Sequence, residues 1–428
     1  GDQHETAVRD TLDPAMPMAG SVEATRDLID QGAPFIYQPV FLDETLMLEG
    51  RPDFLILNGN GRYQIADAKL ARSLKSHKDI KVQLGLYRRL LRSDDQALVY
   101  LGTGATDAVG AEVDPEVDRF LTEARETVES DEIPVVSYAE SRCSACPYYD
   151  VCRPKFEEVG DLSLVYGIDA RSLPGLNKQG IVNLAQLAER DPETIEDAPW
   201  LKGAEKKQRT VLQARAKQTG EITILKPIEL PDGTYVHFDV ESNPLTDTGE
   251  PEVYLWGLLP PPYDNDSFLY AWSDGDADQD RAAWERLLDL VDQLVRRHPD
   301  LRLVHYTAYE ITQLKMYADR YEMRDDPRVA RLLGPQSILM DIQKPILESL
   351  ILPVESYGLK PICKHPDLVN FQWELEESGA QWSVVRYMDY LAEADPPIRE
   401  RIKSEVLTYN RDDVAATRAI QLWLERFE

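Results

Sequence analysis

The sequence has no long apolar run, few cysteines and far fewer basic than acidic residues. No apolar run approaches the ~18 residues that a membrane-spanning helix needs, so we expect no membrane association. No secretory signal is visible, which predicts a cytoplasmic protein. With only four cysteines and no such signal, metal binding is favoured over disulfide bonding. The chain begins on Gly1 and its first motif stands at residue 4, so we expect further native sequence upstream.

The shortage of positive charge limits which functions are possible. Asp and Glu outnumber Lys and Arg by 76 to 47, for a net charge of −29. This excess excludes a protein that grips nucleic acid by bulk electrostatics. It does not exclude an enzyme whose bound cations carry the positive charge to a phosphate. Basic clusters over 69–81 and 202–217 are either solvated helix faces or phosphate tracks, and both interpretations stay open. The length of 428 residues predicts two or three domains.

Two apolar runs near the start, 51–57 and 63–69, predict a pair of strands. Asn58-Gly59-Asn60-Gly61 stands between them and is a strong hairpin signal, because Asn and Gly tolerate positive φ. The hairpin would bring Asp53, Asp67 and Lys69 together, with the last two on one face. An exposed Asp-x-Lys is usually solvated charge. Two carboxylates beside an ammonium also form a minimal site for Mg²⁺ or Mn²⁺.

Motifs on both sides of this hairpin carry a family resemblance. They are His4-Glu5 at the start, Gln83 and Tyr87 on one face of a helix predicted over 78–92, and the C-x2-C-x5-C pattern of Cys143, Cys146 and Cys152. In this order they resemble the RecB-type PD-(D/E)xK nucleases over roughly residues 1–155. The similarity is greatest to the branch with an iron–sulfur cluster, which includes the CRISPR-associated Fe–S exonucleases.

The resemblance implies a role for each motif residue. His4, Asp53 and Asp67 would bind the metal, and Lys69 would act as catalytic base or stabilise charge. Gln83 and Tyr87 would support them.

The three clustered cysteines need a fourth ligand for either a tetrahedral zinc or a 4Fe–4S cluster. In the resembled family this ligand is a cysteine upstream of His-Glu, which would lie before Gly1. Cys363 is about 200 residues away, and we interpret it as a buried structural cysteine. An incomplete cluster, a zinc with three cysteines and no metal at all stay open. For the intact protein we favour an Fe–S site at Cys143, Cys146 and Cys152.

The composition shifts after Gly160. Residues 161–218 predict paired short helices joined by turns that contain glycine. The stretch resembles a helix-hairpin-helix element, in which backbone N–H groups at a helix start hold a DNA phosphate. A plain helical linker fits equally well.

From Tyr235 the pattern predicts a second α/β region. Residues 235–241 form a predicted strand with Asp239 and Glu241 on one face, and the chain ends on a helix that carries Tyr409 and Asp413. These features resemble the RNase H-like fold of DEDD-type 3′–5′ exonucleases. The resemblance implies that Asp239, Glu241 and Asp413 bind two metal ions and that Tyr409 positions the water. Glu310 stands where such enzymes carry Asp, and its longer arm shifts the geometry.

The sequence therefore predicts an α/β protein of three parts. These are a RecB-like PD-(D/E)xK nuclease domain over 1–158, a helical connector over 159–222 and an RNase H-like domain over 223–428. The order resembles a bacterial and archaeal family of RecB-like nucleases, some of which continue into a superfamily I helicase. It implies a Mg²⁺- or Mn²⁺-dependent deoxyribonuclease that acts on single-stranded ends in DNA repair, recombination or defence.

Two alternatives remain. One is a catalytically silent platform that binds nucleic acid for a helicase partner. The other is a nuclease whose cleavage resides in the C-terminal domain alone.

Overall fold

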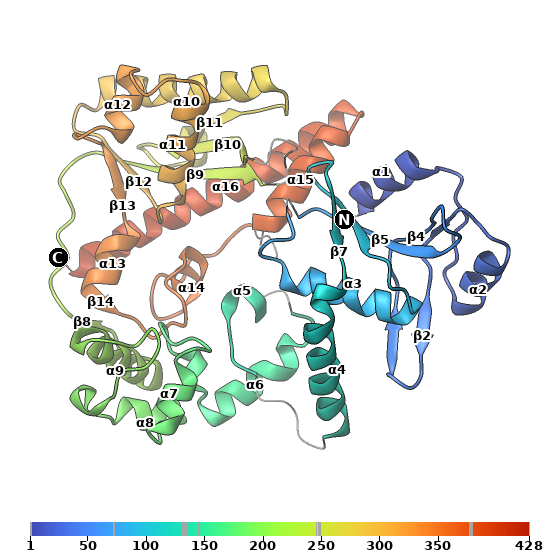
Figure 1. Cartoon of the computed structure of the whole chain (residues 1–428). Helices are drawn as coiled ribbons and strands as arrows, with labels where there is room; N and C mark the ends of the chain where they lie inside the picture. The colour runs from blue at the N-terminus through green and yellow to red at the C-terminus, as the bar shows by residue number, and fades with distance from the viewer. Residues whose placement is uncertain are drawn as a thin grey trace. The chain divides into compact units, whose positions relative to one another are not determined.

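The chain forms two compact units, each built around a five-stranded sheet (Figure 1). The computed structural model describes residues 2–71, 73–130, 136–143, 146–244, 246, 250–375 and 380–427. The first unit comprises Gly1–Val135 and Pro244–Pro251, and the second comprises Val136–Asn243 and Glu252–Glu428. Helices and strands alternate in both units, which confirms the α/β class. The domain boundaries at residues 158 and 222 stay a prediction.

The sheet of the first unit contains the predicted hairpin. Its strand order is β1 (Phe35–Tyr37), β4 (Phe54–Leu57), β5 (Tyr63–Lys69), β6 (Ala97–Leu101) and β7 (Thr106–Val109). Strands β4 and β5 are antiparallel, with Phe54 opposite Ala66. Strand β6 runs parallel to β5, so a crossover is required, and α3 (Lys78–Leu91) supplies it. A separate ribbon pairs β2 (Phe41–Asp43) with β3 (Leu48–Gly50).

Helices cover both faces of this sheet. The face formed by Phe54 and Ala66 packs against α1 (Asp2–Leu12), and the face formed by Leu55 and Ile65 packs against α3 and α4 (Asp114–Glu129). The helical stretch at the start of the chain is broken into α1 and α2 (Val22–Asp30). The break contains Pro14 and Pro17, which disfavour a continuous helix, and α2 restarts at the Ser21 cap.

The second unit begins with α5 (Glu140–Cys143) and α6 (Tyr149–Val159), and the connector that follows has a core of its own. This core contains Leu176, Ile181, Leu187 and Val211. Glu355 ties both segments to the C-terminal half, because it lies 2.6 Å from an Arg153 guanidinium nitrogen on α6 and 2.6 Å from Lys217 Nζ in the connector. The connector helices are α7 (Leu173–Lys178), α8 (Leu184–Ala188) and α9 (Ala204–Thr219), with 3-10 turns at Leu162–Leu164 and Pro192–Thr194.

The second sheet is mixed. Its strand order is β11 (Leu269–Trp272), β10 (Glu252–Leu259), β9 (Tyr235–Asn243), β12 (Arg302–His305) and β13 (Leu339–Asp341). The first three strands are antiparallel, whereas β12 and β13 run parallel to β9. A small ribbon pairs β8 (Thr223–Ile224) with β14 (Leu350–Ile351).

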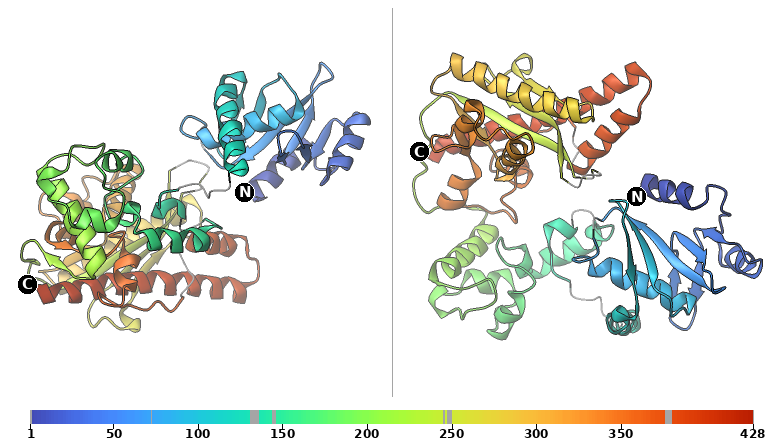
Figure 2. Two further views of the ribbon diagram at one scale, coloured as in Figure 1. Left: turned by 90° about the horizontal axis from the view of Figure 1, so that it is seen from below. Right: turned by 45° about the horizontal axis from the view of Figure 1, so that its top comes forward.

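Long helices lie on the two faces of this sheet, as Figure 2 shows for α10 (Ala277–Arg297) and α16 (Pro396–Leu424). Phe238 and Trp256 pack with Trp284 of α10, whereas Val304 packs with Ile420 of α16. The terminal helix α16 begins with Pro396 and Pro397 in its first turn, where proline is tolerated. The remaining helices are α11 (Tyr309–Arg320), α12 (Pro327–Leu333), α13 (Gln343–Ser349), α14 (Leu359–Lys364) and α15 (Ala380–Ala392). Among the described residues no helix is long and apolar enough to cross a membrane.

Candidate functional site

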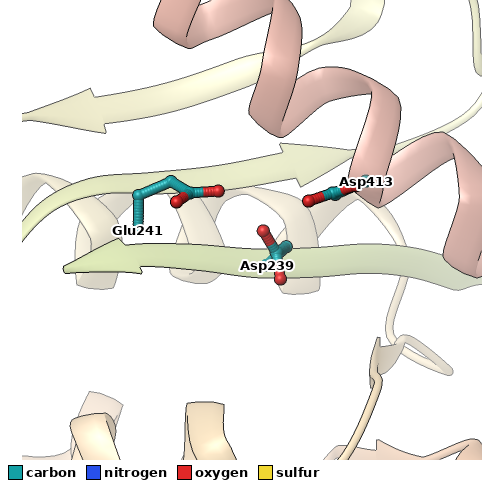
Figure 3. A group of neighbouring side chains, drawn as sticks. All are labelled: Asp239, Glu241 and Asp413. Carbon is teal, nitrogen blue, oxygen red and sulfur yellow. The ribbon is translucent and has the colours of Figure 1, made fainter. Parts of the chain in front are cut away.

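Three carboxylates meet where β9 passes beneath α16 (Figure 3). Asp239 and Glu241 are two residues apart on β9, so strand alternation places both on the face that α16 covers. Asp413 comes from α16. One oxygen of each side chain lies within 4.8 Å of the others, and Glu241 and Asp413 are buried. The structure thus brings together three of the residues that we predicted as metal ligands.

The pKa values of these acids show that the site carries unbalanced negative charge. Burial and then the neighbouring Asp413 raise the pKa of Glu241 to about 8. The pKa of Asp239 is raised well above its usual range by burial and by Glu241. Burial also raises the pKa of Asp413. Clustered oxygen ligands that repel one another fit a hard divalent cation such as Mg²⁺ or Mn²⁺, which would relieve this repulsion.

Neutral hydrogen-bond donors orient the three carboxylates. Asn410 is fully buried on α16 and donates through Nδ2 to Asp239 Oδ2 at 2.7 Å and to Glu241 Oε1 at 3.4 Å. Trp373 Nε1 donates to Asp413 Oδ1 at 2.6 Å. Room for Asn410 exists because residue 257 is glycine: a Cβ there would lie 1.8 Å from Asn410 Oδ1. Neither donor was predicted from the sequence. The spacing of Asn410 and Asp413, three residues apart on one helix, was the available signal.

Tyr409 and Lys360 lie beside the triad. Tyr409 is buried, and its hydroxyl accepts a hydrogen bond from Lys360 Nζ at 3.3 Å. Burial and then Glu241 raise the pKa of Tyr409, so its phenol stays protonated. Lys360 acts in the opposite sense on the acids, because its charge lowers the pKa of Asp413 and Glu241 against the effect of burial. A hydroxyl donor and a cation therefore stand next to the carboxylates.

Glu310, the predicted middle ligand, lies outside this group. It stands in the first turn of α11, is 3% exposed, and places Oε2 3.5 Å from Nδ1 of His305. Burial raises the pKa of Glu310, and His305 opposes that rise. Its charge still contributes to the raised pKa of Asp239, so the two side chains lie within electrostatic reach of each other. The role of Glu310 as a ligand stays a prediction, and it would compete with His305.

A second acidic site lies at the hairpin of the first unit. Asp67 is 1% exposed, accepts a hydrogen bond from the Asp53 amide at 3.1 Å and lies 2.5 Å from Lys69 Nζ. Asp53 Oδ2 in turn accepts from the Ala68 amide at 2.7 Å. The hairpin thus brings Asp53, Asp67 and Lys69 to one place. Here the chain itself supplies a cation to one of the two acids.

The electrostatics of this site follow from that arrangement. Burial and then Asp67 raise the pKa of Asp53 to about 8. Burial lowers the pKa of Lys69, but Asp67 and Asp53 outweigh it and the net pKa is raised, so the ammonium is retained. Gln83 Nε2 donates to the Tyr87 hydroxyl at 2.9 Å, which confirms that these residues share a face of α3. Burial and then Asp67 raise the pKa of Tyr87, so this pair lies beside the acids.

His4, the remaining predicted ligand of the first site, is engaged elsewhere. Its Nε2 lies 3.0 Å from the Tyr100 carbonyl oxygen. In the part of the chain that the structure describes, no set of three potential ligand atoms includes His4. Its neighbour Glu5 accepts a hydrogen bond from Gln38 and raises the pKa of Asp53. Metal binding by His4 stays a prediction, and it would require that His4 leave Tyr100.

The cysteines are free thiols. The Cys146 amide donates to the Cys143 carbonyl oxygen at 3.1 Å, and residues 144 and 145 lie outside the described residues. Within the described ranges these two and Cys152 do not gather as a single zinc would require, with sulfurs ~4 Å apart. Cys363 lies in the core beside Ile362 and Ala416, as expected for a structural cysteine. It is therefore not the fourth ligand of a cluster.

Comparison with known families agrees with the two sites. Residues 10–153 match the family model of the PD-(D/E)XK nuclease superfamily, and residues 236–425 match that of the RNase_H superfamily. No curated protein matches the chain. The two matched ranges contain Asp53, Asp67 and Lys69 in the first case and Asp239, Glu241 and Asp413 in the second.

Proposed function

From a chain that joins a PD-(D/E)XK nuclease superfamily domain to an RNase H superfamily domain, we propose a deoxyribonuclease that uses Mg²⁺ or Mn²⁺ and degrades single-stranded DNA from its ends. The observation that carries this proposal is the triad of Asp239, Glu241 and Asp413. Its members come from a strand and a helix about 170 residues apart in the sequence, yet their oxygens lie within 4.8 Å of one another.

A divalent cation bound by these carboxylates would activate water for in-line attack and stabilise the leaving oxygen. The surrounding residues have distinct tasks. Asn410 and Trp373 hold the three carboxylates in place through their N–H groups. Tyr409 keeps its proton, so it can donate to the attacking water or to a phosphate oxygen. Lys360, 3.3 Å from Tyr409, adds positive charge where a phosphate would bind.

The hairpin site is the second candidate centre for hydrolysis. Asp53 and Asp67 would hold a cation there, with Lys69 stabilising negative charge on the phosphate. Supporting this role, Lys69 stays charged and Tyr87 and Gln83 lie beside it. Glu5 is a further potential ligand because its charge acts on Asp53.

Three finer points remain proposals that rest on family resemblance. They are the preference for DNA over RNA, a superfamily I helicase as partner, and a role in DNA repair, recombination or defence. A 4Fe–4S cluster at Cys143, Cys146 and Cys152 is supported by their spacing. Iron and sulfide analysis of protein purified without oxygen, with its visible absorption spectrum, tests the cluster.

The activity is tested with end-labelled oligonucleotides. We expect linear single-stranded DNA to be degraded with Mn²⁺ and to stay whole with EDTA. A circular single strand of the same composition should resist, because it has no end, and an RNA oligonucleotide should be cut more slowly. A chain that binds the linear strand and never cuts it would instead be a silent platform.

Single substitutions assign the cleavage to a domain. If the triad carries hydrolysis, Asp413→Asn should reduce the rate more than ~100-fold, because the cation loses a ligand. If the hairpin site contributes, Lys69→Ala should remove a separate share of the activity. Loss through Lys69→Ala alone, with Asp413→Asn unchanged, would contradict the role of the triad.

A further inference from the structure

The connector carries an exposed tryptophan at the tip of a tight turn. Ala198 and Leu201 exchange both backbone hydrogen bonds, at 3.1 and 2.9 Å, and this leaves Pro199 and Trp200 at the tip. Trp200 adopts φ of +64°, which a bulky residue rarely does, and it is 56% exposed. A strained backbone that presents a large aromatic side chain to solvent costs stability, and such strain clusters at functional sites.

Hydrogen bonds fix the groups on either side of this indole, the Arg171 guanidinium and the Pro199 backbone. The Arg171 guanidinium lies 4.1 Å from the centre of the Trp200 ring. Arg171 Nε donates to Asp169 Oδ2 at 2.8 Å, and Asp169 Oδ1 accepts from the Ser172 amide at 3.1 Å. The Ser172 hydroxyl then donates to the Pro199 carbonyl oxygen at 2.9 Å, next to the tryptophan. Cation and aromatic ring are thus fixed relative to each other, which lowers the entropy lost when a ligand stacks on them.

A cavity of about 570 Å³ adjoins the tryptophan, because Arg171 and Pro199 belong to its wall. The wall also contains Lys178 and Arg190. Of the two acids in the wall, Asp197 is neutralised by Lys207 at 2.7 Å. The volume falls within the ~300–1,000 Å³ of small-molecule sites, and the excess of cations favours an anionic group.

The charge of the connector differs from that of the whole chain. Residues 159–222 contain nine Lys and Arg and nine Asp and Glu, whereas the chain has a net charge of −29. An anionic polymer would therefore meet less repulsion here than over the chain as a whole. Together with an open aromatic ring, this favours a nucleic-acid strand as the ligand.

We infer that Trp200 and the adjoining cavity form a subsite for an unpaired nucleotide of a single strand. The base stacks on the indole, and a neighbouring phosphate enters the cavity beside Lys178 and Arg190. Bases of every kind have a flat face, so this subsite would select unpaired strands rather than a sequence. This inference rests on the proposed function at one point, because it takes the bound strand to be the substrate of the nuclease.

Fluorescence anisotropy with a labelled oligothymidylate tests the base contact. The full chain is used in EDTA, so that no cleavage occurs. We expect Trp200→Ala to weaken binding about tenfold, within the ~1–3 kcal/mol of one stacked base, and Trp200→Phe to recover most of it. The control is Phe120→Ala, which removes a 44% exposed aromatic side chain from the acidic helix α4 and should leave binding unchanged. Melting curves check that each variant is folded.

A duplex of the same length separates stacking from general attraction. Trp200→Ala should leave duplex binding unchanged, because paired bases offer no free face. Equal weakening for both forms, or none for the single strand, would overturn the inference. Parallel titrations with oligothymidylate and oligouridylate show whether the subsite favours DNA or RNA.

The phosphate contact has its own readout. Lys178→Gln should flatten the dependence of log affinity on log salt by about 0.7, the value for one phosphate contact on a single strand. An unchanged slope would remove Lys178 from the subsite.

The subsite and the nuclease proposal fail in different ways. A strand that binds through Trp200 but stays whole with Mn²⁺ contradicts only the nuclease. If Trp200→Ala changes neither cleavage nor binding, only the subsite is contradicted.

Discussion

The hairpin site and the carboxylate triad balance their negative charge differently. In the first unit, Asp67 has its own cation, because Lys69 Nζ lies 2.5 Å away. In the second unit, Asp239, Glu241 and Asp413 face one another and are oriented by the neutral donors of Asn410 and Trp373. The hairpin site therefore pairs one of its acids directly with a cation, whereas the three acids of the triad exceed the nearby charge of Lys360 and need an external cation. Removing the cation should harm the first site, whereas neutralising an acid should relieve the second when no metal is present.

The largest effect is expected at the hairpin. Lys69→Met should lower the stability of the first unit by about 3 kcal/mol, because it leaves Asp67 buried without its ion pair. Thermal melting followed by circular dichroism measures the loss. Tryptophan fluorescence serves as an internal control, because all seven tryptophans belong to the second unit. The exposed Lys75→Met should have no effect, and adding Asp67→Asn to Lys69→Met should restore most of the stability.

The triad should respond in the opposite direction. At pH 8 and above, Glu241→Gln should raise the stability of the metal-free second unit by about 1 kcal/mol, because it removes a buried charge that Asp413 repels and keeps an acceptor for Asn410. The tryptophan fluorescence melting curve in EDTA measures this gain. A loss of stability as large as that of Lys69→Met would mean that the protein itself neutralises the charge of the triad. The proposed difference between the two sites would then be wrong.

The third effect concerns the donors and is measured as metal affinity rather than as stability. Asn410→Ala should weaken Mn²⁺ binding about tenfold, because residues that orient metal ligands typically contribute that much. Gly257→Ala should act in the same direction by displacing Asn410. Calorimetric titration with Mn²⁺ checks both variants, and Leu422→Ala, at a 42% exposed position of the same helix, is the control. Unchanged affinity in Asn410→Ala would limit that residue to packing.

Much of both sites follows from short-range rules. Alternation along a strand places Asp239 and Glu241 on one face, and the Asn-Gly turn brings Asp53 and Asp67 together. The spacing of Gln83 and Tyr87 correctly predicts their contact on α3.

What the sequence did not predict depends on packing. Trp373 reaches Asp413 from another segment, and no local pattern marks that contact. The His-Glu motif does not show which side chain turns inward, and the structure turns Glu5 toward Asp53 while His4 bonds to Tyr100. Glu310 was predicted as a ligand from its order in the chain, but in the structure its carboxylate lies beside the His305 ring.

The central claim, that the triad needs an external cation, is tested most directly by melting the second unit at several pH values. The pKa of Glu241 is about 8 in the folded protein and near 4.5 when unfolded, so its protonated form stabilises the fold below pH 4.5. That contribution is lost as the pH rises through 8. We predict that the melting temperature by tryptophan fluorescence in EDTA falls between pH 5 and pH 8. Mn²⁺ should restore it at pH 8 in the wild-type chain but not in Asp413→Asn. An equal gain from Mn²⁺ in Asp413→Asn would contradict the account.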